Sequence, residues 1–403
     1  DLSRVSSWIR SRTGVRPRMT RLLNRRTLLG AGVSVSALTA VAACGDNPIN
    51  GSRLSPIPLA DVSPWGVNTF LDLEVETWKR RQTLRMVQDA GIRWIKQHVP
   101  WADIEIPGPD QYFDAAARRN SWAKYDEIVD LADEFNVAII ARVDRAPSWS
   151  RPNLRHPTSP PYDFDLYGSF LTKLATRYRG RIRHYQIWNE PNLSSEWGGA
   201  PPDPKGYANL LRVAFDAVKS VDNANVVIAA PLAATLENSP RAMDELTYLE
   251  RIYERGAGEH LDVQAANAFG LEYPPDEPPD RDVLNFRRVE FLRELMIEFG
   301  LSGKPIWFNE YGWNASPADM SPTKLVWRRV PEEQQARWSV EGVRYGLTNW
   351  PWAGVFNLWF FRKPLGALQP NQSEYYFRMV DPDFTPRLVY RAVRRAATGV
   401  SFP

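Results

Sequence analysis

The chain has 403 residues, of which 43% are hydrophobic and 24% are charged. This balance is ordinary for a globular protein and excludes a chain dominated by low-complexity sequence. The net charge is +3, but residues 1–26 hold eight arginines and one aspartate, a local charge of +7, so the remaining chain carries −4. Because the body of the protein is mildly acidic, the composition indicates no nucleic-acid partner.

The first segment in chain order has the layout of an export signal. A basic stretch follows Met19 and ends at Arg25 and Arg26, residues 27–43 carry no charge, and Cys44 follows Val-Ala-Ala. A charged region, a short apolar region and small residues before a cleavage point are typical of secretory signals. An uncleaved anchor helix with an incidental cysteine is the alternative. Cys44 is the single cysteine, which excludes a disulfide within one chain.

Two resemblances sharpen this prediction. Val-Ala-Ala-Cys resembles a bacterial lipobox, in which the cysteine takes a diacylglycerol, and residues 24–29 resemble a twin-arginine signal. They imply a signal peptide at 19–43 and lipidation at Cys44. Residues 1–18 precede the first methionine and are expected to be an upstream extension. Residues 44–59 are rich in Pro, Gly, Asn and Ser and predict a flexible tether. We therefore expect an exported protein anchored at the bacterial cell surface or on the periplasmic face of the membrane.

Residues 60–403 alternate short apolar runs with amphipathic stretches, the pattern of repeated βα units. The eight strand candidates cover 65–70, 94–99, 137–143, 184–189, 226–230, 263–268, 306–309 and 354–359. The helix candidates cover 74–90, 125–135, 166–178, 207–221, 243–255, 286–299, 332–347 and 385–397. Eight such units predict a (β/α)₈ TIM barrel in a single domain. The strand-to-helix loops are long and rich in Pro, Trp and Gly, as expected where a barrel builds its site.

Two of the strand candidates deliver a glutamate at the carboxyl-terminal tip. The fourth runs into Asn189-Glu190-Pro191, and the seventh runs into Asn309-Glu310-Tyr311. A carboxylate that caps an apolar strand is costly to bury without a purpose. Two of them facing each other across a barrel mouth match the needs of glycosidic cleavage, one protonated to donate and one ionised to attack. A carboxylate at a helix N-terminus and a salt-bridge partner are the structural alternatives for Glu190 and Glu310.

Asn189-Glu190-Pro191 with Glu310 resembles glycoside hydrolase clan A, and the surroundings resemble family 39 and its relatives. The resemblance covers roughly residues 60–400 and implies a retaining glycosidase, with Glu190 as acid/base and Glu310 as nucleophile. It also implies that Asn189 bonds the sugar 2-hydroxyl and that Trp359 floors the subsite of the cleaved sugar. A core aromatic is the alternative for Trp359.

The strand ends depart from the clan pattern at two places. Lys96 stands where an arginine is usual, without its bidentate fork. Phe269 occupies a tip where the clan often has a His or Tyr near the nucleophile, and a phenyl ring cannot donate a hydrogen bond. Either Asn267 or Tyr273 is expected to take the role of this His or Tyr, or the role stays vacant. Arg142 and Asp144 either contact the sugar or pair with each other.

The long loops also hold tryptophans suited to stacking on sugar rings, with loop anchoring as the alternative. The tryptophans expected to bind the substrate are Trp101, Trp149 and Trp313. His98, His156, His184 and His260 show no metal-ligand spacing, and no phosphate-binding loop occurs, so no metal and no cofactor are expected. We expect a carbohydrate substrate and a monomeric protein.

Two other functions are compatible with the same residues. A lipid-anchored carbohydrate-binding protein without catalysis would explain the changes at Phe269, and a transglycosylase would share the covalent intermediate. A turnover assay separates the first from a hydrolase, and product analysis with acceptor sugars separates the second.

Overall fold

The computed structural model describes residues 56–151 and 156–400. The predicted extension, the signal peptide, Cys44 and the tether up to residue 55 lie outside the described residues. No helix in the described ranges is both long enough and apolar enough to cross a membrane.

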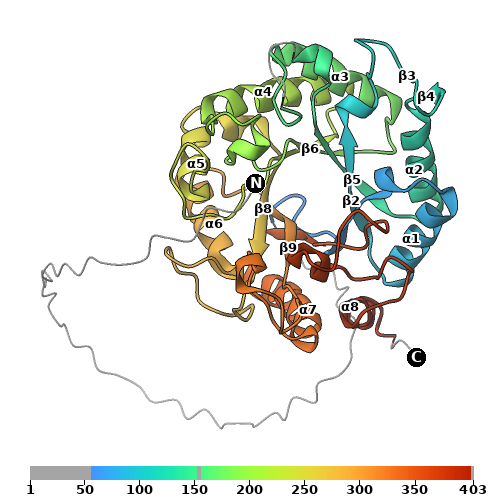
Figure 1. The fold of residues 1–403 in the computed structure, drawn as a ribbon. Coiled ribbons are helices and arrows are strands. Elements are labelled where there is room, and N and C mark those ends of the chain that lie inside the picture. The colour runs from blue at the N-terminus through green and yellow to red at the C-terminus, as the bar shows by residue number, and fades with distance from the viewer. Residues whose placement is uncertain (1–55, 152–155, 401–403) are drawn as a thin grey trace, which may run out of the picture. The chain divides into compact units, whose positions relative to one another are not determined.

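Eight parallel strands close into a barrel, with helices packed around the outside (Figure 1). Around the barrel the order is β1-β10-β9-β8-β7-β6-β5-β2. Their bounds are β1 Trp65–Thr69, β2 Trp94–Pro100, β5 Ala138–Asp144, β6 His184–Ile187, β7 Val226–Ala229, β8 Val263–Phe269, β9 Ile306–Gly312 and β10 Ala353–Leu358. The predicted (β/α)₈ barrel is therefore confirmed, with each strand in its expected place. β6 is shorter than predicted, and β9 extends past Glu310.

The helices alternate with the strands along the chain as predicted. Their bounds are α1 Thr77–Asp89, α2 Ala123–Glu134, α3 Phe164–Arg177, α4 Pro204–Val221, α5 Glu245–Tyr253, α6 Val289–Glu298, α7 Glu332–Asn349 and α8 Leu388–Thr398. A two-stranded hairpin, β3 Phe113–Asp114 and β4 Arg119–Asn120, lies in the loop after β2 and was not expected from the sequence.

The core has two parts. A large apolar cluster fills the layer between strands and helices, and a smaller one, built around Trp307 with Ile228 and Val263, fills one end of the barrel. Leu59 and Val62 pack against this second cluster, and the Trp307 indole donates to the Leu59 carbonyl at 2.9 Å. Because Trp307 lies near the start of β9, the last residues of the predicted tether close the barrel at the amino-terminal ends of its strands. The long strand-to-helix loops lie at the other end of the barrel, where the strands have their carboxyl-terminal ends.

Candidate active site

The chain after β6 adopts a constrained backbone where it enters the barrel mouth. Trp188 and Glu190 have φ values of 69° and 43°, in the left-handed region that non-glycine residues rarely occupy. Trp188 is held by its buried ring, which donates a hydrogen bond to the Glu196 carbonyl, and the Glu190 amide donates to the Pro231 carbonyl after β7. Strain of this kind persists where surrounding contacts fix it, and it is common at functional sites.

Glu190 is half-buried and bonded by a neutral amide. Asn267 on β8 donates to Glu190 Oε1 at 2.7 Å, and Asn309 on β9 donates to the Asn267 side-chain oxygen at 3.3 Å. Burial raises the pKa of Glu190 to about 8, and the negative charge of Glu310 acts in the same direction. Glu190 is therefore poised to carry a proton at neutral pH, as a general acid must.

Glu310 has a different environment. Its side chain is 8% exposed, and Lys96 on β2 donates to Glu310 Oε1 at 2.7 Å from a side chain that is 3% exposed. Burial lowers the pKa of Lys96 even though Glu310 opposes the change. The Lys96 ammonium therefore contacts the Glu310 carboxylate directly, whereas the Glu190 carboxyl accepts a hydrogen bond from the neutral amide of Asn267.

Asn267 connects the two carboxylates, because its amide donates to Glu190 and its backbone lies opposite Glu310 in the register of β8 and β9. A register shift between β8 and β9, at Ala266 and Asn267, sets Asn267 opposite Glu310. Asn267 was expected near the nucleophile, whereas its amide bonds Glu190. The ring of Phe269 packs against the rings of Phe377 and Trp327.

Asp144 at the end of β5 organises a second group of charges. Arg142 donates to one of its oxygens at 2.7 Å, and His98 pairs with the other. Burial opposes ionisation of Asp144, but Arg142 and His98 together hold its pKa well below its usual range. Of the two roles open to Arg142 and Asp144, the structure shows the mutual pair. The Arg142 charge also acts on Lys96 and on Glu190.

A third carboxylate lies near the site and was missed from the sequence. Glu196, in a short 3₁₀ turn after β6, pairs with Arg145 at 3.3 Å, and burial raises its pKa. Its charge also acts on Glu190. The only signal was its position six residues after Glu190, which does not separate a solvated loop carboxylate from a partly buried one.

Asn189 and Trp359 both lie at the mouth. Asn189 is 5% exposed, and its side-chain oxygen accepts no hydrogen bond from the described residues. Trp359 is half-buried, with the amine of Lys96 6.0 Å and that of Lys363 5.4 Å from its ring centre. An unpartnered acceptor and a partly exposed indole suit a polar ligand with an apolar face.

The tryptophans of the loops behave differently from the expectation of sugar stacking. Trp101 is 0% and Trp313 1% exposed, and their indoles donate to the Glu105 carboxylate and the Tyr273 carbonyl at 2.7 Å. Trp149 is half-buried and donates to the Glu105 carbonyl at 2.6 Å. For Trp101 and Trp313 the structure thus replaces substrate binding by loop anchoring, because neither ring has a face open to a ligand.

In the parts of the chain that the structure describes, no group of three or more His, Cys, Asp or Glu side chains is arranged to hold a metal ion. No family model matches the sequence, and no curated protein matches it significantly.

Solved structures do match. A family 39 glycoside hydrolase from Bacteroides cellulosilyticus is 18% identical with a TM-score of 0.61, over 85% of this chain and 64% of that one. A family 39 β-xylosidase from Caulobacter crescentus is 17% identical with a TM-score of 0.58, over 85% of this chain and 72% of that one.

A third match is a family 5 enzyme from Streptomyces cattleya, solved in complex with Manβ1-4GlcNAc. It is 16% identical with a TM-score of 0.61, over 83% of this chain and 80% of that one. This chain spans less than two thirds of the length of the Bacteroides enzyme. The resemblance to clan A, with family 39 among the matches, is thus confirmed at the level of the (β/α)₈ fold.

Proposed function

We propose that this protein is a retaining O-glycoside hydrolase that cleaves a β-linked oligo- or polysaccharide by double displacement. The observation that supports the proposal is that two carboxyl groups at one barrel mouth have different hydrogen-bonding and charged neighbours. Glu310 is paired with the Lys96 ammonium, and Glu190 is half-buried with only an amide and a pKa raised to about 8. One protonated and one ionised carboxyl is the combination that glycosidic cleavage requires.

In the first step, Glu190 gives its proton to the glycosidic oxygen as the bond from that oxygen to the anomeric carbon breaks. The Glu310 carboxylate attacks the anomeric carbon and forms a glycosyl ester. The ester is uncharged, so the pKa of Glu190 falls, and Glu190 takes a proton from the incoming water. That water attacks the anomeric carbon and releases Glu310, which restores both groups.

Lys96 holds Glu310 in place and offsets its charge before the attack. Asn189 is positioned to donate from its amide to a sugar hydroxyl and to accept from a second one with its unpartnered oxygen. Trp359 supplies an apolar face for the sugar ring. The names of the matched structures, among them a β-xylosidase and an exo-β-1,4-mannosidase, support a carbohydrate substrate without selecting the sugar.

Export and lipid anchoring through Cys44 complete the proposal and depend on the sequence alone. A carbohydrate-binding protein without catalysis is the alternative, and a turnover assay separates it from a hydrolase; both glutamates have the different neighbours that catalysis requires, although Phe269 donates no hydrogen bond to Glu310. A transglycosylase would use the same residues and differs only in the acceptor.

A mechanism-based 2-fluoro glycoside tests the proposal. We expect a covalent adduct on the peptide that contains Trp307 to Trp313, with the label on Glu310. Glu310→Gln should abolish labelling and turnover together, whereas Glu341→Gln on the outer surface of α7 should leave both unchanged. Products should retain the anomeric configuration in an NMR time course. Inversion, or a label on another residue, would overturn the mechanism.

A further inference from the structure

The inner face of β8 continues past Asn267 to an aromatic ring. Side chains of a barrel strand alternate between the interior and the outer layer, so every second residue of β8 from Val263 to Phe269 shares one face. Val263 and Ala265 belong to the apolar cluster inside the barrel, and Asn267 donates to Glu190, which identifies this face as the inner one. Phe269 therefore points into the mouth, about 6.6 Å beyond Asn267 along the strand.

The neighbouring strand β9 carries a glycine at the same level. Phe269 pairs with Gly312, two residues beyond Glu310 and on the same face of the strand. Gly312 has a φ of 148°, a backbone conformation that residues with a side chain rarely adopt. A Cβ built there would lie 3.5 Å from the Trp359 carbonyl oxygen and 3.7 Å from the Phe377 ring. Beyond the Glu310 carboxylate, the mouth is therefore bordered by the rings of Phe269 and Phe377.

Trp327, in the loop after β9, completes an aromatic cluster with these two rings. Its ring centre lies 6.3 Å from that of Phe269 and 5.6 Å from that of Phe377, and the two phenyl rings are 5.4 Å apart. Phe377 is 2% exposed, whereas Phe269 and Trp327 are half-buried. Because Phe269 lies on the inner face of its strand, the exposed part of its ring is reached through the mouth.

The barrel order places this cluster on the leaving-group side of the site. Glu310 lies on β9 and Glu190 follows β6, and the shorter path between these strands runs through β8 and β7. In the proposed reaction the anomeric carbon lies next to Glu310 and the leaving oxygen next to Glu190. Trp359, which supplies a face for the cleaved sugar, follows β10 on the other side of β9. The unit joined through the leaving oxygen is therefore directed toward Phe269 and Trp327.

We propose that Phe269 and Trp327 bind the sugar unit on the leaving-group side of the scissile bond, an inference that rests on the proposed function. A partly exposed aromatic ring offers an apolar surface to the C–H face of a sugar. Sites for small molecules commonly combine such rings with a few placed polar groups, which Glu190 and Asn267 supply here. The contact requires a leaving group with a ring, so a leaving group of a single atom gains nothing from it.

Two substrates that share the cleaved sugar test the proposal. A β-glycosyl fluoride loses a single atom, whereas the β-1,4-linked disaccharide loses a whole sugar; pairs built on glucose, xylose, mannose and galactose identify the sugar that the wild-type protein accepts. Trp327→Ala should lower kcat/KM for the disaccharide about 10-fold, which corresponds to about 1.4 kcal/mol. The same variant should leave kcat/KM for the fluoride unchanged. Trp327→Phe keeps a ring and should recover most of the loss.

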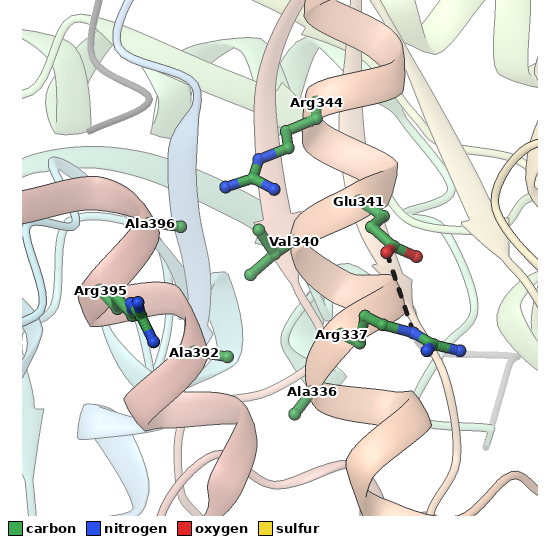
Figure 2. A pocket seen from close by; sticks show the side chains of 8 residues that line it. All are labelled: Ala336, Arg337, Val340, Glu341, Arg344, Ala392, Arg395 and Ala396. Carbon is green, nitrogen blue, oxygen red and sulfur yellow. Dashed lines mark ion pairs between the residues drawn. The ribbon is translucent and has the colours of Figure 1, made fainter. Parts of the chain in front are cut away.

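Two controls change residues outside the mouth. Trp78→Ala removes a tryptophan that is 58% exposed at the start of α1, and Arg344→Ala removes a side chain that lines the hollow between α7 and α8 (Figure 2). Both variants should hydrolyse the two substrates as the wild-type protein does.

The outcomes separate this inference from the proposed function. Equal losses on fluoride and disaccharide in Trp327→Ala would mean that the ring only anchors its loop, and an unchanged rate on the disaccharide would mean that the ring does not contact the leaving group. Either result would overturn the inference and leave the proposed function standing. A wild-type protein that hydrolyses neither member of any pair would overturn the proposed function, and the inference with it.

Discussion

Lys96→Met removes the cation that contacts the buried Glu310 carboxylate. Lys96 Nζ is 2.7 Å from Glu310 Oε1, with side chains 3% and 8% exposed. Breaking a buried ion pair leaves one charge without its partner, which costs about 3–5 kcal/mol of unfolding free energy. We expect Lys96→Met to be destabilised by this amount in urea titrations followed by tryptophan fluorescence.

The double variant Lys96→Met/Glu310→Gln removes both charges and should recover most of that loss, because no buried charge remains. The coupling free energy in the double-mutant cycle should be at least about 1 kcal/mol. Lys96→Arg keeps the charge and serves as the control, with a smaller loss than Lys96→Met. A cost below about 1 kcal/mol for Lys96→Met, or a double variant whose loss equals the sum of the two single losses, would refute the reasoning.

Three further predictions concern other parts of the chain. Glu190→Ala should lower the rate of cleavage far more for substrates with poor leaving groups than for activated aryl glycosides, and azide should partly restore it. For the wild-type protein, the rate on substrates with poor leaving groups should fall as pH rises through about 8. Equal losses of rate on both substrate types would assign the proton donor to another residue. Gly270→Ala should cost about 1–3 kcal/mol in the urea titration, because a Cβ there would meet the buried Trp313 ring at 2.0 Å. Cys44→Ser should shift the protein from the detergent phase to the aqueous phase or leave it uncleaved, and unchanged partitioning would contradict lipidation.

The barrel could be predicted from sequence because its strands are buried on both faces. Runs such as Val226–Ala229 and Ala138–Asp144 read as nearly continuous apolar segments, and their spacing by amphipathic stretches identifies the βα repeat. Glu190 and Glu310 were identifiable for the same reason, since a carboxylate at the end of such a run stands out. The predicted end of β9 was wrong: the strand continues through Glu310 to Gly312, because Glu310 stays in the strand ladder opposite Asn267.

Side-chain direction in the loops could not be predicted. Trp101 and Trp149 lie in Pro-rich loops of similar composition, yet Trp101 stacks on Phe170 in the core and Trp149 stays half-buried. The pairs Lys96–Glu310 and Asn267–Glu190 join residues 214 and 77 positions apart. Such contacts depend on strand register and on the extra residue that β9 carries opposite β8 between Phe308 and Glu310, which local sequence patterns do not encode.

The different roles that we propose for Glu190 and Glu310 depend on their neighbours. A carboxyl beside a buried ammonium gains when it is ionised, whereas a carboxyl that is buried against an amide and a second negative charge gains when it is protonated. Lys96 and Asn267 create this difference. Lys96 lies on β2 and Asn267 on β8, and in the barrel order these two strands belong to the two different paths that lead from β9 to β6. The resemblance to clan A implies an arginine where this chain has Lys96, so Glu310, the proposed nucleophile, has a single ammonium contact without a guanidinium fork. The identity of the residue at position 96 thus bears on how firmly Glu310 is held, and the identity at position 267 on how well Glu190 keeps its proton.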